Sequence, residues 1–235
     1  FDMSQGIACP KFLTDRKGGC SLLFARHCFP WDDEFMSKPE TPIQKKNRSA
    51  IMNAGLEVFS KFGFRGSTLD QIALESGLSK PNILYYFKSK EVIYTTLLGE
   101  LLTDWLKPVR DIDPDGDPIA EILGYAAHKM EMSQNYPRQS RLYANEIIQG
   151  APRISNVLTS ELHEVVDKFA QLIKSWSKKG LIRDVDPHHL IFSIWAMTQH
   201  YADFDFQVRA VLGHDDPFPK GEKHVEDMLR QMLTV

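Results

Sequence analysis

The 235-residue chain has few cysteines and no long run of apolar residues. Its three cysteines, Cys9, Cys20 and Cys28, all lie near the N-terminus, and their spacing matches no zinc-binding pattern. Because the rest of the chain lacks cysteine, a secreted protein held together by disulfides is disfavoured, and a cytoplasmic protein is expected. No apolar stretch approaches the roughly 20 residues that a membrane-spanning helix requires. We therefore expect neither a membrane partner nor a bound metal.

Motifs of catalysis are missing as well. The sequence contains no glycine-rich phosphate loop and no serine nucleophile elbow. The segment His163–Asp167 is similar to the zinc-protease helix motif, but Asp167 stands where the second metal-binding histidine is needed. One enzymatic alternative stays open, in which His200 and Asp203 share a pocket in a small helical enzyme or adaptor. Otherwise the sequence predicts no enzyme, no catalytic residue and no cofactor.

The sequence also lacks the alternation of apolar and polar residues that is typical of strands, and its apolar residues recur at helical spacing. We therefore predict an all-α fold, with Pro108 ending one helix and a breaker-rich linker at residues 111–117. Residues 1–40 are expected to form a disordered or extended arm, with Met36 as a natural start. The predicted helices are Ile43–Lys61, Lys90–Leu106, Pro118–Asn135, Pro137–Gly150, Pro152–Lys179, Pro187–Leu212 and Lys223–Leu233.

Residues 67–90 carry the signals of two short helices joined by a tight turn. Thr68 can cap the first helix, and Gln71, three residues later, can complete a capping box. Gly77 is placed to adopt the left-handed conformation that stops this helix. Ser79 can cap the second helix, in whose first turn Pro81 loses only an N–H that has no partner. This layout predicts a helix-turn-helix, whose second helix enters the major groove of DNA.

The second helix of this motif has one face that suits DNA. Its buried face is expected to hold Ile83, Leu84 and Phe87. The side chains expected to face the bases are Lys80, Asn82 and Tyr85. Contacts to phosphates, which position a protein without reading the sequence, are expected from Thr68, Tyr86, Lys88 and Lys90. Ser79 and Pro81, at the start of the helix, complete the candidate DNA-binding set.

The charge of the chain is distributed unevenly. Residues 36–90 contain nine Lys or Arg and four Asp or Glu, whereas residues 91–235 contain fifteen Lys or Arg and twenty-two Asp or Glu. A formal net charge of −3 therefore conceals a basic segment attached to an acidic one. This asymmetry suits a protein that contacts phosphates at one end, although solvated surface charge is the usual explanation for clusters of this size.

Residues 55–98, GLEVFSKFGFRGSTLDQIALESGLSKPNILYYFKSKEVIYTTLL, resemble the N-terminal DNA-binding domain of the TetR family of bacterial repressors. The resemblance covers roughly Lys45 to Trp105 and includes the spacing, the glycines and the Leu-Tyr-Tyr-Phe run. It implies an N-terminal three-helix domain that binds operator double-stranded DNA and a larger helical domain. We accordingly divide the chain into the arm (1–40), a helix-turn-helix domain (41–89) and a ligand-binding and dimerisation domain (90–235).

The second half is similar to one branch of this family. The segments YPRQSRLYANEIIQGAPRI (136–154) and DPHHLIFSIWAMTQHYADFDFQVRAVLG (186–213) resemble the ligand domain of the branch that regulates pyrimidine utilisation. The resemblance implies a small-molecule effector, such as uracil or thymine, that releases the repressor from its operator. The segment after Leu212 and the linker at residues 113–117 depart from this pattern, so a TetR-type regulator of a different ligand class is the alternative.

Residue chemistry allows a pyrimidine site in this half. A flat ring with alternating carbonyl and N–H groups needs an aromatic platform and an amide that both donates and accepts hydrogen bonds. Trp195 and Gln199 are four residues apart and so share one helix face, and Trp105 could close the other side. The remaining candidate lining residues are Leu101, Leu102, Tyr143 and Asn145. A tryptophan at helical spacing is more often a core residue and Gln199 could be a surface residue, so the residues alone leave both interpretations open.

A homodimer is also expected. Helix-turn-helix domains act in pairs because the half-sites on DNA recur about one helical turn apart. The predicted helices Pro187–Leu212 and Lys223–Leu233 carry more apolar residues than one buried face needs, which favours a four-helix interface about a two-fold axis. The alternative is that both helices complete the core of the monomer. The predicted helix Lys90–Leu106 begins beside the DNA-binding motif and ends beside the expected pocket, so it is the expected link between them.

Overall fold

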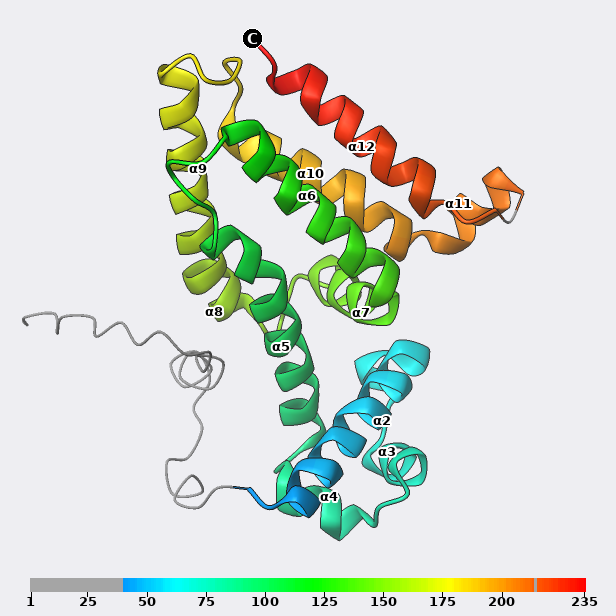
Figure 1. The fold of residues 1–235 in the computed structure, drawn as a ribbon. Coiled ribbons are helices and arrows are strands. Elements are labelled where there is room, and N and C mark those ends of the chain that lie inside the picture. The colour runs from blue at the N-terminus through cyan, green and yellow to red at the C-terminus, as the bar shows by residue number, and fades with distance from the viewer. Residues whose placement is uncertain (1–39, 214) are drawn as a thin grey trace, which may run out of the picture. The chain divides into compact units, whose positions relative to one another are not determined.

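The computed structural model describes residues 40–213 and 215–235, and every regular element in these ranges is helical (Figure 1). The all-α fold predicted from the sequence is confirmed. The chain divides into two compact units, residues 1–36 and 37–235, and the described residues all lie in the second. The predicted arm lies outside the described residues except for Glu40. The boundary predicted at residue 90 stays a prediction, because residues 37–235 form one unit.

Three helices build the head, which we define as residues 42–89. They are α2 (Pro42–Gly66), α3 (Leu69–Ser76) and α4 (Lys80–Tyr86), with α3 packed against both of the others. Each helix turns one apolar face inward, and the shared core contains Ile51, Phe59, Ile72, Ile83 and Phe87, none more than 1% exposed. The head therefore has a closed apolar core beneath its two short helices.

The local signals of the helix-turn-helix are confirmed. The Thr68 side chain accepts a hydrogen bond from the backbone N–H of Gln71, and the Gln71 side chain accepts one from the backbone N–H of Thr68. Gly77 ends α3 in the left-handed conformation with φ 68°, and Ser79 caps α4. Gly63, two residues after the predicted end of the preceding helix at Lys61, has φ 65° and breaks the helical conformation of α2 three residues before its last residue. Glycine is needed at both positions because positive φ is strained for other residues.

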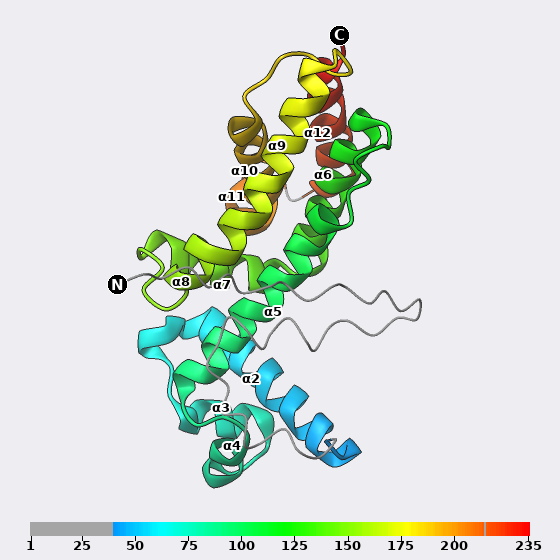
Figure 2. The ribbon, with the colours of Figure 1, turned by 90° about the vertical axis from the view of Figure 1, so that its left-hand side faces the viewer.

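The helix α5 (Lys90–Arg110) connects the head to the helices that follow it, as it runs from the head toward α6 and α7 (Figure 2). Its first half adds Ile93, Tyr94 and Leu98 to the head core. The prediction that Pro108 ends this helix is wrong, because α5 continues to Arg110. A proline this close to the end removes only one backbone hydrogen bond, and the N–H of Asp111 closes the last turn on the Lys107 carbonyl at 3.0 Å.

The body, which we define as residues 90–235, is a layered helical bundle. Its main helices after α5 are α6 (Pro118–Asn135), α7 (Pro137–Ile148), α9 (His163–Lys178), α10 (Pro187–Asp203) and α12 (Phe218–Leu233). Helix α10 packs against α6, α7, α9 and α12, which places it at the centre of the body. Helix α7 also packs against α2 of the head.

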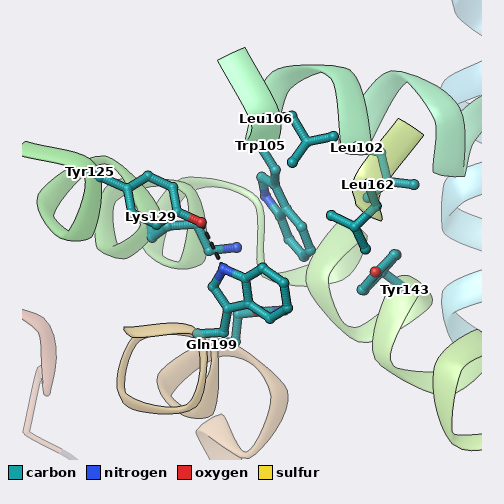
Figure 3. A pocket seen from close by; sticks show the side chains of 9 residues that line it. Leu102, Trp105, Leu106, Tyr125, Lys129, Tyr143, Leu162 and Gln199 are labelled. Carbon is teal, nitrogen blue, oxygen red and sulfur yellow. Dashed lines mark hydrogen bonds between the residues drawn. The ribbon is translucent and has the colours of Figure 1, made fainter. Parts of the chain in front are cut away.

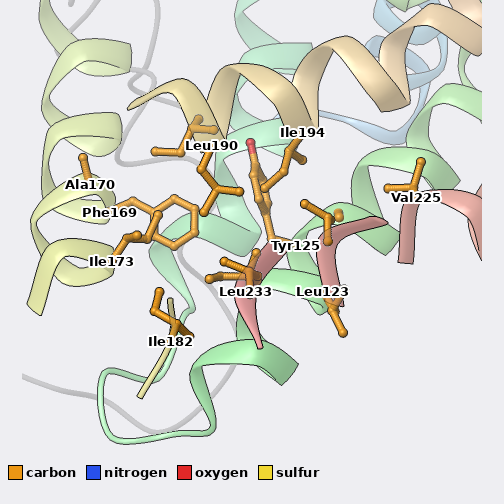
Figure 4. Close-up of a cluster of buried hydrophobic side chains, with 14 of the residues drawn as sticks. Leu123, Tyr125, Phe169, Ala170, Ile173, Ile182, Leu190, Ile194, Val225 and Leu233 are labelled. Carbon is orange, nitrogen blue, oxygen red and sulfur yellow. The ribbon is translucent and has the colours of Figure 1, made fainter. Parts of the chain in front are cut away.

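The core of the body forms where α6, α9, α10 and α12 meet (Figure 4). Phe169 and Ile173 from α9 lie beside Leu190 and Ile194 from α10, and Leu233 closes the cluster from α12. All five are at most 3% exposed. Burial of side chains of this size stabilises the fold by about 1.5–3 kcal/mol each, before the entropy of ordering them is counted.

Three helix boundaries of the body differ from the prediction. The single helix predicted over residues 187–212 is broken at Phe204 into α10 and α11 (Asp205–Leu212). Aspartates flank the break, and aspartate favours helix ends because its side chain competes for backbone N–H groups. The helix predicted over residues 152–179 begins with α8 (Ser155–Val157) and a π-helical turn at Leu158–Leu162. Helix α12 begins at Phe218, five residues before the predicted start, with Pro219 accepted in its first turn.

Within residues 40–213 and 215–235, no helix is both long and apolar enough to cross a membrane.

Candidate DNA-binding head and effector pocket

The outer face of α4 holds most of the side chains that were predicted to face DNA. Lys80, Pro81 and Tyr85 are exposed, and Asn82 is partly exposed. Ile83 and the C-cap Phe87 point into the head core, as expected. The expected burial of Leu84 is wrong, because its side chain is 41% exposed. A seven-residue helix buries only a narrow stripe, and Leu84 lies beside that stripe on the outer surface.

Hydrogen bonds and one ion pair hold this face in place. Asn47 of α2 donates to the Tyr86 hydroxyl at 3.1 Å, and Gln44 donates to the Tyr85 hydroxyl at 3.4 Å. The Lys80 ammonium lies 3.0 Å from a carboxylate oxygen of Asp70 on α3. These contacts fix α4 against both other helices of the head. Such a fixed surface can read DNA without first being ordered.

The predicted phosphate contacts fall into two groups. Thr68 and Lys88 are exposed, and Tyr86 is partly exposed. Lys90 is different, because its ammonium donates to the backbone carbonyls of Phe64 and Ser67 at 2.7 and 2.6 Å. Burial and the nearby charge of Arg153 lower the pKa of Lys90. Lys90 therefore ties the start of α5 to the last turn of α2 and to Ser67 just after it, and its contact with phosphate stays a prediction.

A pocket lies in the body where α5, α6, α7 and α10 meet (Figure 3). Five of the seven predicted lining residues surround it: Leu102, Trp105, Tyr143, Trp195 and Gln199. The cavity that these side chains enclose is about 30 Å³. This is room for little more than a water molecule, so a ring would bind there only after the lining side chains move apart.

Two predicted lining residues lie elsewhere. Leu101 is buried in a neighbouring cluster with Trp105 and Met132. Asn145 is exposed on the outer side of α7 and does not line the pocket. The direction of each side chain around its helix explains both positions. Helix α5 points Leu102 toward the cavity rather than Leu101, and α7 points Tyr143 toward it rather than Asn145.

Four lining residues were missed in the sequence: Leu106, Tyr125, Lys129 and Leu162. Lys129 is the most unusual of these, since it is 2% exposed and its ammonium lies 3.6 Å from the centre of the Trp105 ring. The spacing of the sequence indicates that Lys129 is buried. Lys129 falls at helical spacing among Ile122, Ala126 and Met130, on the apolar face of its helix, where a lysine is unusual.

Burial determines the hydrogen bonding and the protonation of the polar groups in the pocket. The indole N–H of Trp195 donates to the Tyr125 hydroxyl at 2.7 Å, drawn as the dashed line in Figure 3. Burial raises the pKa of both Tyr125 and Tyr143 to about 12, so both hydroxyls keep their protons near neutral pH. Burial also lowers the pKa of the Lys129 ammonium to about 7, and the charge of Asp203 opposes this effect. The indole N–H of Trp105 is buried and has no hydrogen-bond acceptor within the described part of the chain.

Helix α7 connects the pocket wall to the head. Its Ser140 hydroxyl donates to the Asp203 carboxylate of α10 at 2.6 Å, and the Arg141 guanidinium donates to the Ala202 carbonyl at 3.0 Å. At the same end of α7, Arg138 forms an ion pair with Glu57 of α2 at 2.5 Å. Tyr143 of the same helix lines the pocket. A shift of α10 against α7 would therefore alter the contacts that α7 makes with α2 of the head.

A second set of contacts joins head and body. The Arg153 guanidinium lies over the Phe64 ring at 3.6 Å and pairs with Glu146 at 3.2 Å. The Glu146 side chain is 1% exposed and that of Arg153 is 14% exposed, so this ion pair is largely shielded from water. Buried ion pairs tolerate little misalignment. The loop after α7 is thus held against the last turn of α2.

Two family models match the chain. The model of bacterial regulatory proteins of the tetR family matches residues 51–96, and the model of the YcdC-like protein C-terminal region matches residues 98–234, which is more than half of the chain. The chain belongs to the TetR family. The first match covers the helix-turn-helix, and the second covers the pocket.

Curated relatives place this TetR-family chain more closely. The HTH-type transcriptional regulator RutR of Escherichia coli K12 is 47% identical over 166 residues, which are 71% of this chain and 78% of the relative. The HTH-type transcriptional repressor NicS of Pseudomonas putida KT2440 is 28% identical over 142 residues, 59% of this chain and 67% of the relative. The chain is therefore a helix-turn-helix transcriptional regulator of the RutR branch.

Solved structures share the TetR-family fold. The putative transcriptional regulator SCO4942 from Streptomyces coelicolor has a TM-score of 0.64 at 22% identity, covering 80% of this chain and 98% of that one. A putative fatty acid metabolism regulator of Clostridium perfringens has a TM-score of 0.62 at 21% identity, covering 79% and 99%. At such identities the likeness concerns the fold alone.

The family membership argues against the enzymatic alternative, since the relatives are named as transcriptional regulators. The geometry agrees with this, because His200 stacks on Phe204 at 5.0 Å whereas the Asp203 carboxylate accepts the Ser140 hydroxyl. Neither residue lines the pocket of Trp105 and Trp195. Among the described residues, no group of three or more His, Cys, Asp and Glu side chains is arranged to hold a metal ion.

Proposed function

We propose that this TetR-family regulator is a homodimeric repressor that a pyrimidine, such as uracil or thymine, releases from its operator. The observation that carries the proposal is the pocket between α5 and α10. Trp105 and Trp195 offer indole surfaces for a flat ring, and the Gln199 amide can donate to one ring atom and accept from the next. The 47% identity to RutR, spread over most of the chain, supports an effector of the kind expected for this branch of the family.

The head supports binding to operator DNA. Its exposed α4 face carries Lys80, Asn82 and Tyr85, and exposed Lys88 lies just beyond the helix. Cationic groups at the margin of such a face contact phosphates, whereas amide and hydroxyl groups reach the edges of bases. Two heads, held about one helical turn of DNA apart, would read two half-sites.

The proposed dimer would form through α10, α11 and α12. These helices expose large apolar side chains, among them Phe192 and Phe206 at 47% and 86%. A second copy of the chain would cover these side chains in a symmetric interface. Sedimentation should show twice the chain mass of 26.9 kDa at micromolar concentration, and a stable monomer there would contradict the dimer.

Coupling between the pocket and the head has two routes in this proposal. Helix α5 carries Leu102 and Trp105 in the pocket wall and begins directly after α4. Helix α7 carries Tyr143 in the wall and pairs with Glu57 of α2 through Arg138. A ring that enters between the two tryptophans would displace either helix and so change the separation of the paired heads.

The experiment compares three proteins on a DNA duplex that the parent selects from a random library. Fluorescence anisotropy should show that uracil weakens DNA binding by the parent. Gln199→Ala should bind the duplex as the parent does but resist release, because it loses ring recognition without a change in the head. Gln134→Ala is the matched control, since Gln134 is exposed on α6 and lies outside the pocket. If Gln199→Ala releases DNA at the same uracil concentration as the parent, the pyrimidine pocket lies elsewhere.

The alternative of a different ligand class is tested with the same protein. Calorimetric titration with pyrimidines, purines and their breakdown products should show binding of oxo-pyrimidines and no binding of purines. The cavity is only about 30 Å³, and a single ring displaces its lining side chains less than a fused double ring does. Tight binding of a bulky purine, with no binding of uracil or thymine, would contradict the proposed effector.

A further inference from the structure

Lys129 has a position that packing alone does not explain. Its side chain is 2% exposed, and Figure 3 shows it on the same side of the pocket as Tyr125, with Gln199 below. The ammonium contacts the face of the Trp105 ring at 3.6 Å. An uncharged residue of similar length, such as methionine, would fill this space without the cost of bringing a charge out of water.

The protein itself compensates this charge only partly. In residues 40–213 and 215–235, no carboxylate lies within ion-pair distance of the Lys129 ammonium. The nearest acidic influence is Asp203 on α10, whose carboxylate is already engaged by the Ser140 hydroxyl at 2.6 Å. Tyr125 on α6 and Tyr143 on α7 stay protonated, since burial raises the pKa of each to about 12. The contact with the Trp105 ring is favourable but weaker than an ion pair in the same surroundings.

Hydrogen-bond donors outnumber acceptors around this space. The Trp105 indole N–H is buried and has no acceptor within the described part of the chain. The Trp195 indole N–H, in contrast, is satisfied by Tyr125. No aspartate or glutamate lines the pocket. A ligand that fits these walls must therefore bring acceptor oxygens, and a negative charge on them would be stabilised strongly in this shielded site.

We propose that Lys129 binds a ring oxygen of the effector and selects acidic oxo-pyrimidines that bind as anions. The inference rests on the proposed function only in placing a pyrimidine in this pocket. In such a ring, loss of the proton from an N–H or C–H flanked by two carbonyl groups spreads the negative charge over the carbonyl oxygens. Lys129 then donates a charge-assisted hydrogen bond to one oxygen, while Gln199 reads the neighbouring edge.

Two probes of nearly the same shape separate charge from ring recognition. Uracil is neutral at pH 7, whereas barbituric acid is an anion at that pH. Calorimetry with the full chain should show that barbituric acid binds about tenfold more tightly than uracil, the ratio expected when a neutral hydrogen bond becomes charge-assisted. Lys129→Met should lose this preference, with a larger decrease in affinity for barbituric acid than for uracil. Lys174→Met is the matched control on the exposed side of α9 and should keep the preference.

The outcomes distinguish this inference from the function on which it rests. If uracil binds the parent as tightly as barbituric acid, or if Lys129→Met keeps the preference, the role of Lys129 is refuted and the pyrimidine effector stands. If neither ring binds the parent, the proposed effector fails and the inference fails with it. Thermal melts establish that Lys129→Met is folded. Should it not fold, Lys129→Gln, which keeps a donor but no charge, is expected to lose the preference in the same way.

Discussion

The head and the body bury different kinds of side chain. In the head the buried residues are apolar with one exception, Ser67, whose hydroxyl donates to the carbonyls of Val58 and Gly63. The body buries Lys129 and Glu146 completely and keeps Asp203 partly buried beside Ser140. An apolar core has one well-packed arrangement, whereas buried charges have a cost that a ligand or a shift of a helix can relieve. The core of the head is thus fixed by apolar packing, whereas the buried charges of the body carry a cost that the proposed effector would offset.

The largest expected effect is on the stability of the apolar core of the head. Phe59→Ala should lower the free energy of unfolding by about 3–5 kcal/mol, because Phe59 is 1% exposed and packs edge-to-face on Tyr94 with ring centres 5.0 Å apart. Denaturation by urea measures the change. Phe62→Ala is the control on the same helix, since Phe62 is 53% exposed and its removal should cost little. Equal effects of both substitutions would show that the head core is not packed as described.

A second prediction concerns the stability of the body and its dependence on pH. Lys129→Met should raise the melting temperature at pH 7 or below by at least 2–4 °C, the shift that corresponds to about 1 kcal/mol in a chain of this size. The reason is that burial lowers the pKa of Lys129 from 10.5 to about 7, so the folded protein carries an unfavourable ammonium below pH 7.

The sign of the pH effect follows from proton binding. Between pH 7 and about 10.5 the unfolded chain keeps the Lys129 proton and the folded chain does not, so stability of the parent rises with pH. The advantage of Lys129→Met should therefore shrink between pH 7 and pH 10 in thermal melts. A constant advantage over this range, or a loss of stability at pH 7, would contradict the buried charge.

The smallest expected effect concerns the surface of the head. Lys88→Ala should weaken binding to all DNA sequences alike and reduce the slope of log affinity against log salt by about one unit, since one phosphate contact is lost. Folding should be unaffected because Lys88 is exposed. Filter binding at several salt concentrations measures the slope, with Lys174→Ala on α9 as the control. An unchanged slope would remove Lys88 from the interface.

The same contrast between head and body explains how much the sequence predicted. The caps at Thr68 and Ser79 and the turn at Gly77 are local signals, and all were confirmed. Leu84 was misplaced because the stripe that a short helix buries depends on its packing partners, which propensity does not reveal. The break at Phe204 was missed for a related reason, since apolar spacing continues through it.

The pocket was predictable only in part. Trp105, Trp195 and Gln199 line one pocket, as the sequence predicted, because an aromatic platform and an amide were sought there and helical spacing puts Trp195 and Gln199 on one face. Their contact with an effector stays a prediction. Lys129 was missed since its importance depends on burial and on the ring of Trp105, which belongs to another helix. Asn145 was included wrongly because its helix turns it to solvent. Contacts between distant segments fix the chemistry of the body, and such contacts leave little trace in a single sequence.

The most direct test of the proposed repressor measures the coupling between its two sites in both directions. Anisotropy gives the factor by which saturating uracil weakens DNA binding, and calorimetry gives the factor by which the selected duplex weakens uracil binding. Coupling between two sites is reciprocal, so the two factors must agree, at a value between about 5 and 150. Uracil that binds the parent but leaves the affinity for DNA unchanged would contradict the account.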